Sequence, residues 1–115
     1  MPANLEAVSP DWANDAELMQ EEAKRAAEFL KALAHENRLM ILCILSQGEK
    51  SVSELERMLS LRQPTVSQQL ARLRADGLVA TRRDGKTIYY SLASEAARIV
   101  VGAVYDVFCG KKKTD

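Results

Sequence analysis

One stretch, from Ser53 to Leu92, constrains the fold of this chain more than any other part of the sequence. It begins with Ser53-Glu54-Leu55-Glu56, a pattern that predicts a capping box at the start of a short helix. A second helix is expected to open at Gln63, because Pro64 suits a first turn, where a backbone N–H has no helical partner to lose. Two helices joined by so short a turn are typical of a helix-turn-helix.

A hairpin is predicted directly after these two helices. The segments 78–83 and 86–92 have the residue types of strands, and Asp84-Gly85 between them favours a tight turn with positive φ angles. Strand alternation places Ile88, Tyr90 and Leu92 on one face of the second strand. The predicted fold class is therefore mainly α with a small β-hairpin, a winged helix-turn-helix.

The second helix has one apolar and one polar face. Val66, Leu70 and Leu73 recur at i, i+4 and i+7, so they form a stripe that faces the domain interior. Polar side chains early on the outward face suit a helix that contacts base edges in the major groove of DNA. The outward-facing residues Thr65, Ser67, Gln68 and Arg72 are therefore expected to bind DNA. An ordinary amphipathic helix with a solvated polar face has the same pattern, and the hairpin that follows favours the DNA interpretation.

The tip of the predicted hairpin is cationic. Arg82, Arg83 and Lys86 flank the turn, where they can contact a phosphate backbone or a minor groove. Sixteen basic and sixteen acidic residues give the whole chain no net charge, but the signs are segregated. Residues 1–30 hold seven acids and two bases, whereas residues 62–90 hold six bases and two acids. Overall neutrality is therefore compatible with binding to double-stranded DNA.

Helices are also predicted on both sides of this unit. Apolar residues at helical spacing indicate one helix from about Asp15 to Leu33 and a core helix from Glu36 to about Gln47, which Gly48 is placed to end. Ser94 can cap a last helix that contains seven apolar residues at spacings of three and four. A chain of 115 residues supports only a modest core, so we expect the first and last helices to form a homodimer interface.

The expected domain organisation is simple. Residues 1–14 are predicted to be a flexible segment, residues 15–109 a DNA-binding and dimerisation domain, and residues 110–115 a basic tail. No apolar run reaches the ~18 residues that span a membrane, and no signal peptide is evident. We therefore expect a cytoplasmic protein without a membrane partner.

The chain has two cysteines, Cys43 in the core helix and Cys109 at the end of the last helix. A permanent disulfide is not expected between positions so far apart in a cytosolic protein. Cys43, within Leu42-Cys43-Ile44, has the setting of a small buried hydrophobe. Cys109 precedes a glycine and three lysines and is expected to be accessible.

Three segments together resemble the ArsR/SmtB family of dimeric repressors, and the resemblance extends from about Leu30 to Cys109. They are Leu33-Ala34-His35-Glu36-Asn37-Arg38-Leu39, Gln63-Pro64-Thr65-Val66-Ser67-Gln68-Gln69-Leu70 and Tyr89-Tyr90-Ser91-Leu92. The resemblance implies that residues matching Gln63, Ser67 and Gln68 read the operator, and that an inducer lowers DNA affinity.

Many members of this family sense metals, but the ligands are not matched here. The family's thiolate pair falls on Ser53–Arg57, which has no cysteine, and its ligands on the last helix fall on 96–108, where Asp106 is the one acid and no histidine occurs. Zinc needs about four ligands, whereas this chain offers two thiols and His35, which the motif places at a helix start. We predict neither a metal site nor a cofactor, and thiophilic arsenite is the metal-type inducer that fits best.

A cysteine in the core helix and another at the end of the last helix resemble the dithiol subgroup that senses persulfides and polysulfides. The resemblance implies that Cys43 and Cys109 of one subunit become joined by a bridge that includes added sulfur. A plain disulfide needs Cα atoms within about 7 Å, so a wider gap would select sulfur donors over peroxide. General thiol-redox sensing and incidental cysteines are alternatives. A small thiol-disulfide or sulfurtransferase enzyme is disfavoured, because no Cys-x-x-Cys is present.

Overall fold

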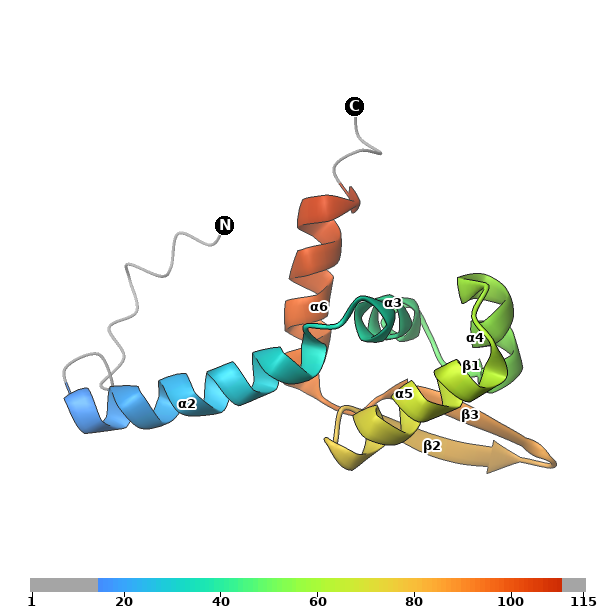
Figure 1. Cartoon of the computed structure of the whole chain (residues 1–115), viewed down its shortest axis with the longest axis horizontal. Coiled ribbons are helices and arrows are strands. Elements are labelled where there is room, and N and C mark those ends of the chain that lie inside the picture. The colour runs from blue at the N-terminus through green and yellow to red at the C-terminus, as the bar shows by residue number, and fades with distance from the viewer. Residues whose placement is uncertain (1–14, 111–115) are drawn as a thin grey trace. The chain divides into compact units, whose positions relative to one another are not determined.

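A computed structural model describes residues 15–110, and the chain divides into two compact units. The first contains the 18-residue helix α2, Ala16–Leu33 (Figure 1). Asp15 precedes it, and its Oδ1 accepts hydrogen bonds from the backbone N–H groups of Glu17 and Leu18 at 3.0 and 3.2 Å. Two large apolar residues of this helix, Met19 and Leu30, are exposed in the single chain.

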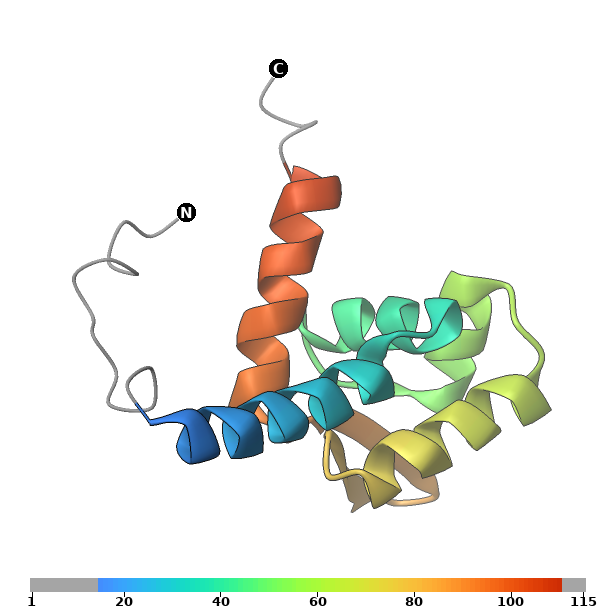
Figure 2. The ribbon, with the colours of Figure 1, turned by 60° about the vertical axis from the view of Figure 1, so that its left-hand side comes forward.

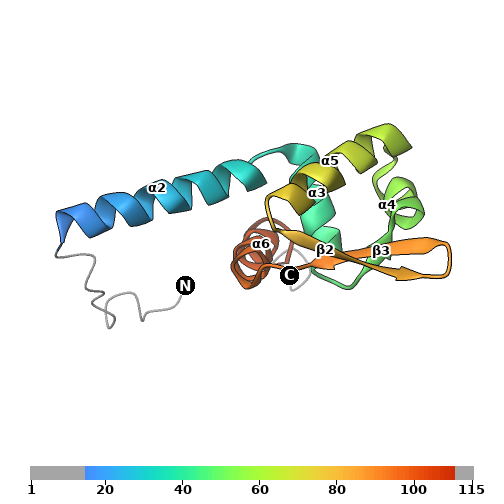
Figure 3. The same cartoon turned by 90° about the horizontal axis from the view of Figure 1, so that it is seen from below.

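The second unit starts at Ala34 and holds all the remaining elements. Its helices and strands follow one another along the chain as α3 Glu36–Leu45, β1 Lys50–Ser51, α4 Val52–Leu59, α5 Gln63–Ala75, β2 Val79–Asp84, β3 Thr87–Leu92 and α6 Glu95–Phe108. The strands form one antiparallel sheet in the order β1-β3-β2. The predicted class, mainly helical with a small hairpin, is confirmed, and Figures 1 and 3 show the β2–β3 hairpin projecting beyond the helices.

The core of the second unit forms around α3, which packs against α4, α5 and α6 (Figure 2). Ile41 and Leu42 of α3 are completely buried, as are Leu55 of α4 and Val101 of α6. A helix that is apolar on nearly all sides is expected at the centre of a small domain, since each of its faces meets another element. Removal of this apolar surface from water is the main force that holds the four helices together.

The start of α4 differs from the prediction. The capping box is formed by Ser51 and Glu54, two residues before the predicted one: the Glu54 N–H donates to Ser51 Oγ at 3.2 Å, and the Ser51 N–H donates to Glu54 Oε1 at 2.8 Å. The prediction that Ser53 opens the helix is therefore wrong. Ser51 also ends strand β1, an element that the sequence analysis did not anticipate, so strand and helix share one residue as their boundary.

The hairpin turn is also shifted by one residue. Asp84 pairs with Thr87, which leaves Gly85 and Lys86 as the two loop residues instead of the predicted Asp84-Gly85. Gly85 has φ +67°. In the described part of the chain Ser60 is the one non-glycine residue with positive φ, so the second loop residue, Lys86, does not have one. Glycine at the first of two loop positions is the pattern of a type II′ turn, one of the two turns whose twist matches that of paired strands.

The remaining helix ends agree with the sequence or differ by two residues. Helix α3 ends at Leu45, before the predicted Gln47. Ser94 caps α6 as predicted, because its hydroxyl accepts from the Ala97 N–H at 3.0 Å. The predicted flexible segment, residues 1–14, and all but the first residue of the predicted basic tail, 110–115, lie outside the described residues. Within residues 15–110 no helix has both the length and the apolar character needed to cross a membrane.

Candidate nucleic-acid interface and thiol pair

Helix α5 has the two faces that the sequence predicts. Val66, Leu70 and Leu73 are completely buried, so they fix the helix against the rest of the unit. The residues proposed to contact DNA lie on its other sides, with Gln63, Gln68 and Arg72 exposed and Thr65 and Ser67 half-buried. The polar face of α5 is therefore accessible, most fully at Gln63, Gln68 and Arg72.

The N-terminal end of α5 is open to an anion. Its N-cap, Arg62, makes no side-chain capping hydrogen bond, and Pro64 lies in the first turn. Backbone N–H groups at the start of a helix that are not capped by a side chain can donate to a phosphate oxygen, and the helix dipole favours negative charge there. This end of α5 can thus contact a DNA backbone while its side chains reach into a groove.

A side-chain contact that the sequence analysis missed holds α5 to the core helix. Arg38 Nε of α3 donates to Gln69 Oε1 of α5 at 3.0 Å, in a half-buried position. A charged hydrogen bond in such a setting is stronger than one between neutral groups. Gln69 is adjacent to Gln68, so this contact fixes the helix at the level of a proposed base-reading residue.

The three basic residues of the hairpin are not equivalent. Arg83 and Lys86 are exposed near the tip. Arg82 instead holds the carboxylate of Glu49, with Arg82 Nε 3.0 Å from both carboxylate oxygens, and its guanidinium lies 4.8 Å from the ring centre of Tyr89. The hydrogen bonds from Arg82 lower the pKa of the Glu49 carboxyl, and those to Glu49 raise the pKa of Arg82. In this structure Arg82 therefore has an internal partner where the sequence predicts a DNA contact.

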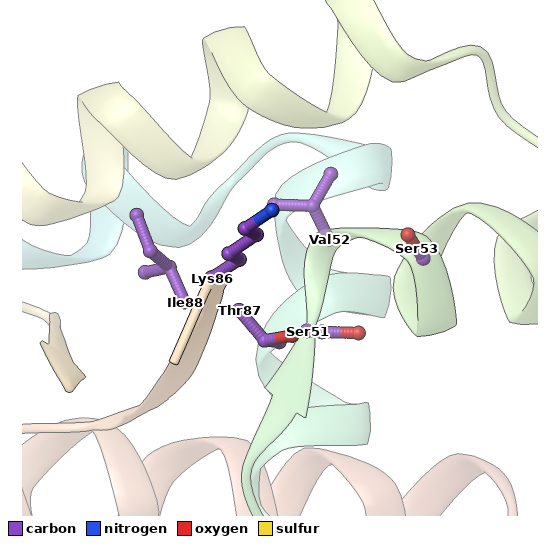
Figure 4. A pocket seen from close by; sticks show the side chains of 6 residues that line it. All are labelled: Ser51, Val52, Ser53, Lys86, Thr87 and Ile88. Atoms are coloured by element: carbon purple, nitrogen blue, oxygen red, sulfur yellow. The ribbon is translucent and has the colours of Figure 1, made fainter. Parts of the chain in front are cut away.

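A pocket of about 270 Å³ lies between the start of α4 and the tip of the hairpin (Figure 4). One side is formed by Ser51, Val52 and Ser53, and the other by Lys86, Thr87 and Ile88. Hydroxyl groups, an ammonium group and the first turn of a helix are all suited to phosphate oxygens. Lys86 of the hairpin thus faces the start of α4 across this pocket.

The two thiols lie on neighbouring helices. Cys43 is half-buried on α3, and Cys109 is exposed at the C-cap of α6, which packs against α3. Burial raises the pKa of the Cys43 thiol, and the charge of Cys109 raises it further. Both cysteines are free thiols in this structure.

His35 is occupied at the start of α3. Its Nδ1 accepts a hydrogen bond from the Asn37 N–H at 3.2 Å, so it serves as the N-cap that the sequence motif predicts. Across residues 15–110, no three histidine, cysteine, aspartate or glutamate side chains gather in a group that could hold a metal ion.

Helix α6 also leaves large apolar side chains exposed in the single chain. Ala97 and Val101 are buried within the chain, whereas Ile99, Val107 and Phe108 are 63, 64 and 69% exposed. Exposed apolar side chains gathered on one element are typical of a surface that another protein covers.

The likeness to known proteins agrees with this architecture. The model of the arsR family of bacterial regulatory proteins matches residues 35–81, from the N-cap of α3 into β2. The chain is 50% identical over 95 residues to the biofilm growth-associated repressor of Agrobacterium fabrum, covering 83% of this chain and 81% of the relative. Relatives also include a protein named transcriptional activator HlyU, from Vibrio cholerae, at 42% identity over 79% of this chain and 84% of the relative.

Solved structures confirm the fold. The transcriptional repressor BigR from Xylella fastidiosa superposes with a TM-score of 0.77 at 46% identity, covering 84% of this chain and 95% of that one. The regulator HlyU from Vibrio vulnificus superposes with a TM-score of 0.80 at 42% identity, covering 83 and 99%. The predicted winged helix-turn-helix and the resemblance to ArsR/SmtB proteins are therefore confirmed. This chain belongs to the arsR family of bacterial regulatory proteins and is a DNA-binding transcriptional regulator, not an enzyme.

Proposed function

We propose that this protein is a homodimeric repressor that releases operator DNA when Cys43 and Cys109 of the same subunit become joined by a bridge of sulfur atoms. Repression is taken from the biofilm growth-associated repressors, which are 50 and 46% identical to this chain. The proposed inducer is a persulfide or an organic polysulfide. The observation that carries the sensing part is the pair of free thiols on α3 and at the end of α6, two helices that pack together.

DNA recognition is assigned to α5 and the hairpin. Gln63 and Gln68 are the best base readers, because both are exposed and an amide can donate and accept at once to an adenine edge. Ser67 and Thr65 are expected to make shorter contacts beside them. Arg72 of α5, with Arg83 and Lys86 of the hairpin, is assigned to the phosphate backbone, where charge contributes affinity without sequence preference. Arg82 lies on the same surface, but its guanidinium is bound to Glu49, which changes the part it can play in DNA binding.

Dimerisation is assigned to the exposed apolar side chains of α6, together with α2. Ile99, Val107 and Phe108 leave about two-thirds of their surface in water in the single chain, which a second copy can cover. A two-fold interface presents two copies of α5 to one duplex. The matching operator is pseudo-palindromic, with half-sites about one DNA turn apart.

The sensing chemistry balances with a polysulfide as the oxidant. One cysteine thiolate attacks the central sulfur of an organic trisulfide and expels one thiolate. The second cysteine attacks the same sulfur and expels the other, so two cysteines and one trisulfide yield a trisulfide bridge and two thiols. With a persulfide, two equivalents are consumed: one supplies the added sulfur, the other accepts two electrons, and the products are two thiols and hydrogen sulfide. Cys109 is the better first nucleophile, because it is exposed whereas burial raises the pKa of Cys43.

A route from the thiols to the DNA surface runs through α3. This helix carries Cys43, and one and a half turns earlier Arg38, which holds Gln69 of α5. A bridge between α3 and α6 would change how these helices pack, and with them the spacing of the two α5 helices in the dimer. A coupling of ~1–3 kcal/mol would weaken operator binding roughly 5- to 150-fold.

The proposal is tested on a DNA duplex selected from a random-sequence pool by the reduced protein. Fluorescence anisotropy gives the Kd before and after treatment with glutathione trisulfide, and intact mass shows whether sulfur is gained with loss of two hydrogen atoms. Cys43→Ser and Cys109→Ser should bind the duplex normally and keep binding it after treatment. Release by either single variant would refute the dithiol mechanism.

Parallel treatments with hydrogen peroxide and with arsenite distinguish the other thiol inducers. Loss of two hydrogen atoms without added sulfur, together with DNA release by peroxide, would assign general thiol-redox sensing. Release by arsenite alone would assign thiophilic metal sensing. Failure of the reduced protein to select any sequence would refute operator binding itself.

A further inference from the structure

The contact between Glu49 and Arg82 joins parts of the chain that are 33 residues apart. Glu49 lies in the loop between α3 and β1, and Arg82 lies on β2 in the hairpin. Two hydrogen bonds from Nε and one from Nη2 hold both carboxylate oxygens, so the planar guanidinium is bound through two of its nitrogens. A paired contact of this kind fixes orientation as well as distance, which a single point charge does not.

Tyr89 holds the same guanidinium from another direction. Arg82 and Tyr89 are opposite each other in the β2–β3 ladder, and the guanidinium carbon lies 4.8 Å from the ring centre. Tyr89 also pairs with Ser51, the last residue of β1. Arg82 is therefore placed at the end of the short β1–β3 ladder, the point where the hairpin leaves the body of the unit.

The hairpin beyond that point depends on few attachments. Strand β1 pairs with β3 at two positions only, through Lys50 and Ser51. In the sheet, residues 83–88 continue past them paired only as the β2–β3 ribbon, and they include Arg83 and Lys86, the second of which faces the start of α4 across a pocket. An angular change at Arg82 is therefore amplified at the tip, where the proposed phosphate contacts lie.

The ion pair between Arg82 and Glu49 contributes little to the stability of the fold. The Arg82 and Glu49 side chains are 54 and 36% exposed, and ion pairs in such settings contribute little to folding because water screens them. The contact instead fixes the orientation of the hairpin relative to the loop, because two nitrogens of the guanidinium are held at once.

We propose that Glu49 and Arg82 form a strut that sets the angle of the hairpin, so that Arg83 and Lys86 meet the DNA backbone. This proposal depends on the proposed DNA binding, in which Arg82 acts as a positioning residue. The alternative is that Arg82 contacts a phosphate directly and that Glu49 competes with DNA for it. The two interpretations predict opposite signs for the loss of the Glu49 charge.

Glu49→Gln is the decisive variant, with Asp84→Asn as its control. Each removes one negative charge from the surroundings of Arg82, and Asp84 forms no ion pair with the described residues. Charge alone predicts tighter DNA binding by both variants, since the duplex is an anion. The strut predicts that Glu49→Gln weakens binding of the reduced protein to its selected duplex by roughly threefold or more, while Asp84→Asn does not weaken it.

A second variant, Arg82→Lys, tests the strut independently. It keeps the positive charge but loses the planar fork, so the strut predicts the same weakening, whereas a simple phosphate contact predicts near-normal affinity. Amide hydrogen exchange without DNA provides a third measurement. Exchange in residues 83–88 should be faster in Glu49→Gln than in wild type, with the thermal midpoint of the fold unchanged.

The outcomes separate the strut from the proposed function. Equal or tighter DNA binding by Glu49→Gln, or unchanged exchange in the hairpin, overturns the strut and leaves operator binding intact. Failure of the wild-type protein to bind the selected duplex overturns operator binding, while the exchange measurement still reports on the strut.

Discussion

Ile99→Ala is the most quantitative test of the dimer surface. Ile99 is 63% exposed in the single chain, so the proposed interface must cover most of its side chain. Complete burial of such a side chain is worth about 1.5–3 kcal/mol, and since alanine keeps the β carbon, a loss of about 1 kcal/mol per subunit is expected. The substitution occurs twice across a two-fold interface, which gives about 2 kcal/mol, or roughly a 30-fold weaker dimer.

Sedimentation equilibrium over a range of concentrations measures this dimer dissociation constant directly. The control is Arg98→Ala on the same helix, which removes an exposed ion pair with Glu95 and little apolar surface. A dissociation constant for Ile99→Ala that equals those of wild type and Arg98→Ala would show that the surface of α6 around Ile99 is not the dimer interface. A loss of affinity for the selected duplex should accompany the loss of dimer, because both half-sites must be held together.

Three further predictions concern single residues. Gln68→Ala should weaken binding to the selected duplex roughly 5- to 150-fold and leave binding to random DNA unchanged, as measured by anisotropy; equal losses on both would remove it from the base readers. Ser51→Ala should lower the free energy of unfolding by about 1 kcal/mol in urea titrations, while Ser53→Ala should not, because Ser51 is the cap of α4. In Cys109→Ser, alkylation of Cys43 should accelerate with pH through a midpoint above that of an unperturbed thiol, because burial is the larger cause of its raised pKa; an ordinary midpoint would contradict this.

The helices that bear the candidate site could be predicted because their signals are local. Val66, Leu70 and Leu73 define the buried face of α5 through spacing alone, and Ser94 announces the start of α6. The boundary of α4 could not be assigned this way. Ser51 with Glu54 and Ser53 with Glu56 both fit a capping box, and the pairing of Ser51 with Tyr89 selects the first by holding Ser51 in the extended conformation that an N-cap needs.

The features that were missed depend on contacts between distant residues. The hairpin register follows from the pairing of Val79 with Leu92, both buried, and this fixes Gly85 and Lys86 as the loop. The Arg82 contact to Glu49 follows from the placement of the α3–β1 loop beside β2, which no local pattern encodes. Positions on single elements were thus predictable, whereas the partners of charged side chains required the tertiary fold.

From the sequence, Cys43 is predicted in the core helix and Cys109 at the end of the last helix, but no local pattern indicates how these two helices pack. The structure adds that α3 and α6 pack against each other. A direct consequence is that the bridge can be sought within a single subunit.

The central claim is that joining these two thiols through added sulfur weakens operator binding. The most direct measurement is the Kd of the trisulfide-treated dimer for its selected duplex, on a sample whose intact mass shows the intrasubunit bridge at full occupancy. We expect an affinity roughly 5- to 150-fold below that of the reduced dimer, restored when a thiol reductant removes the bridge. A fully bridged dimer that binds the duplex as tightly as the reduced one would contradict it.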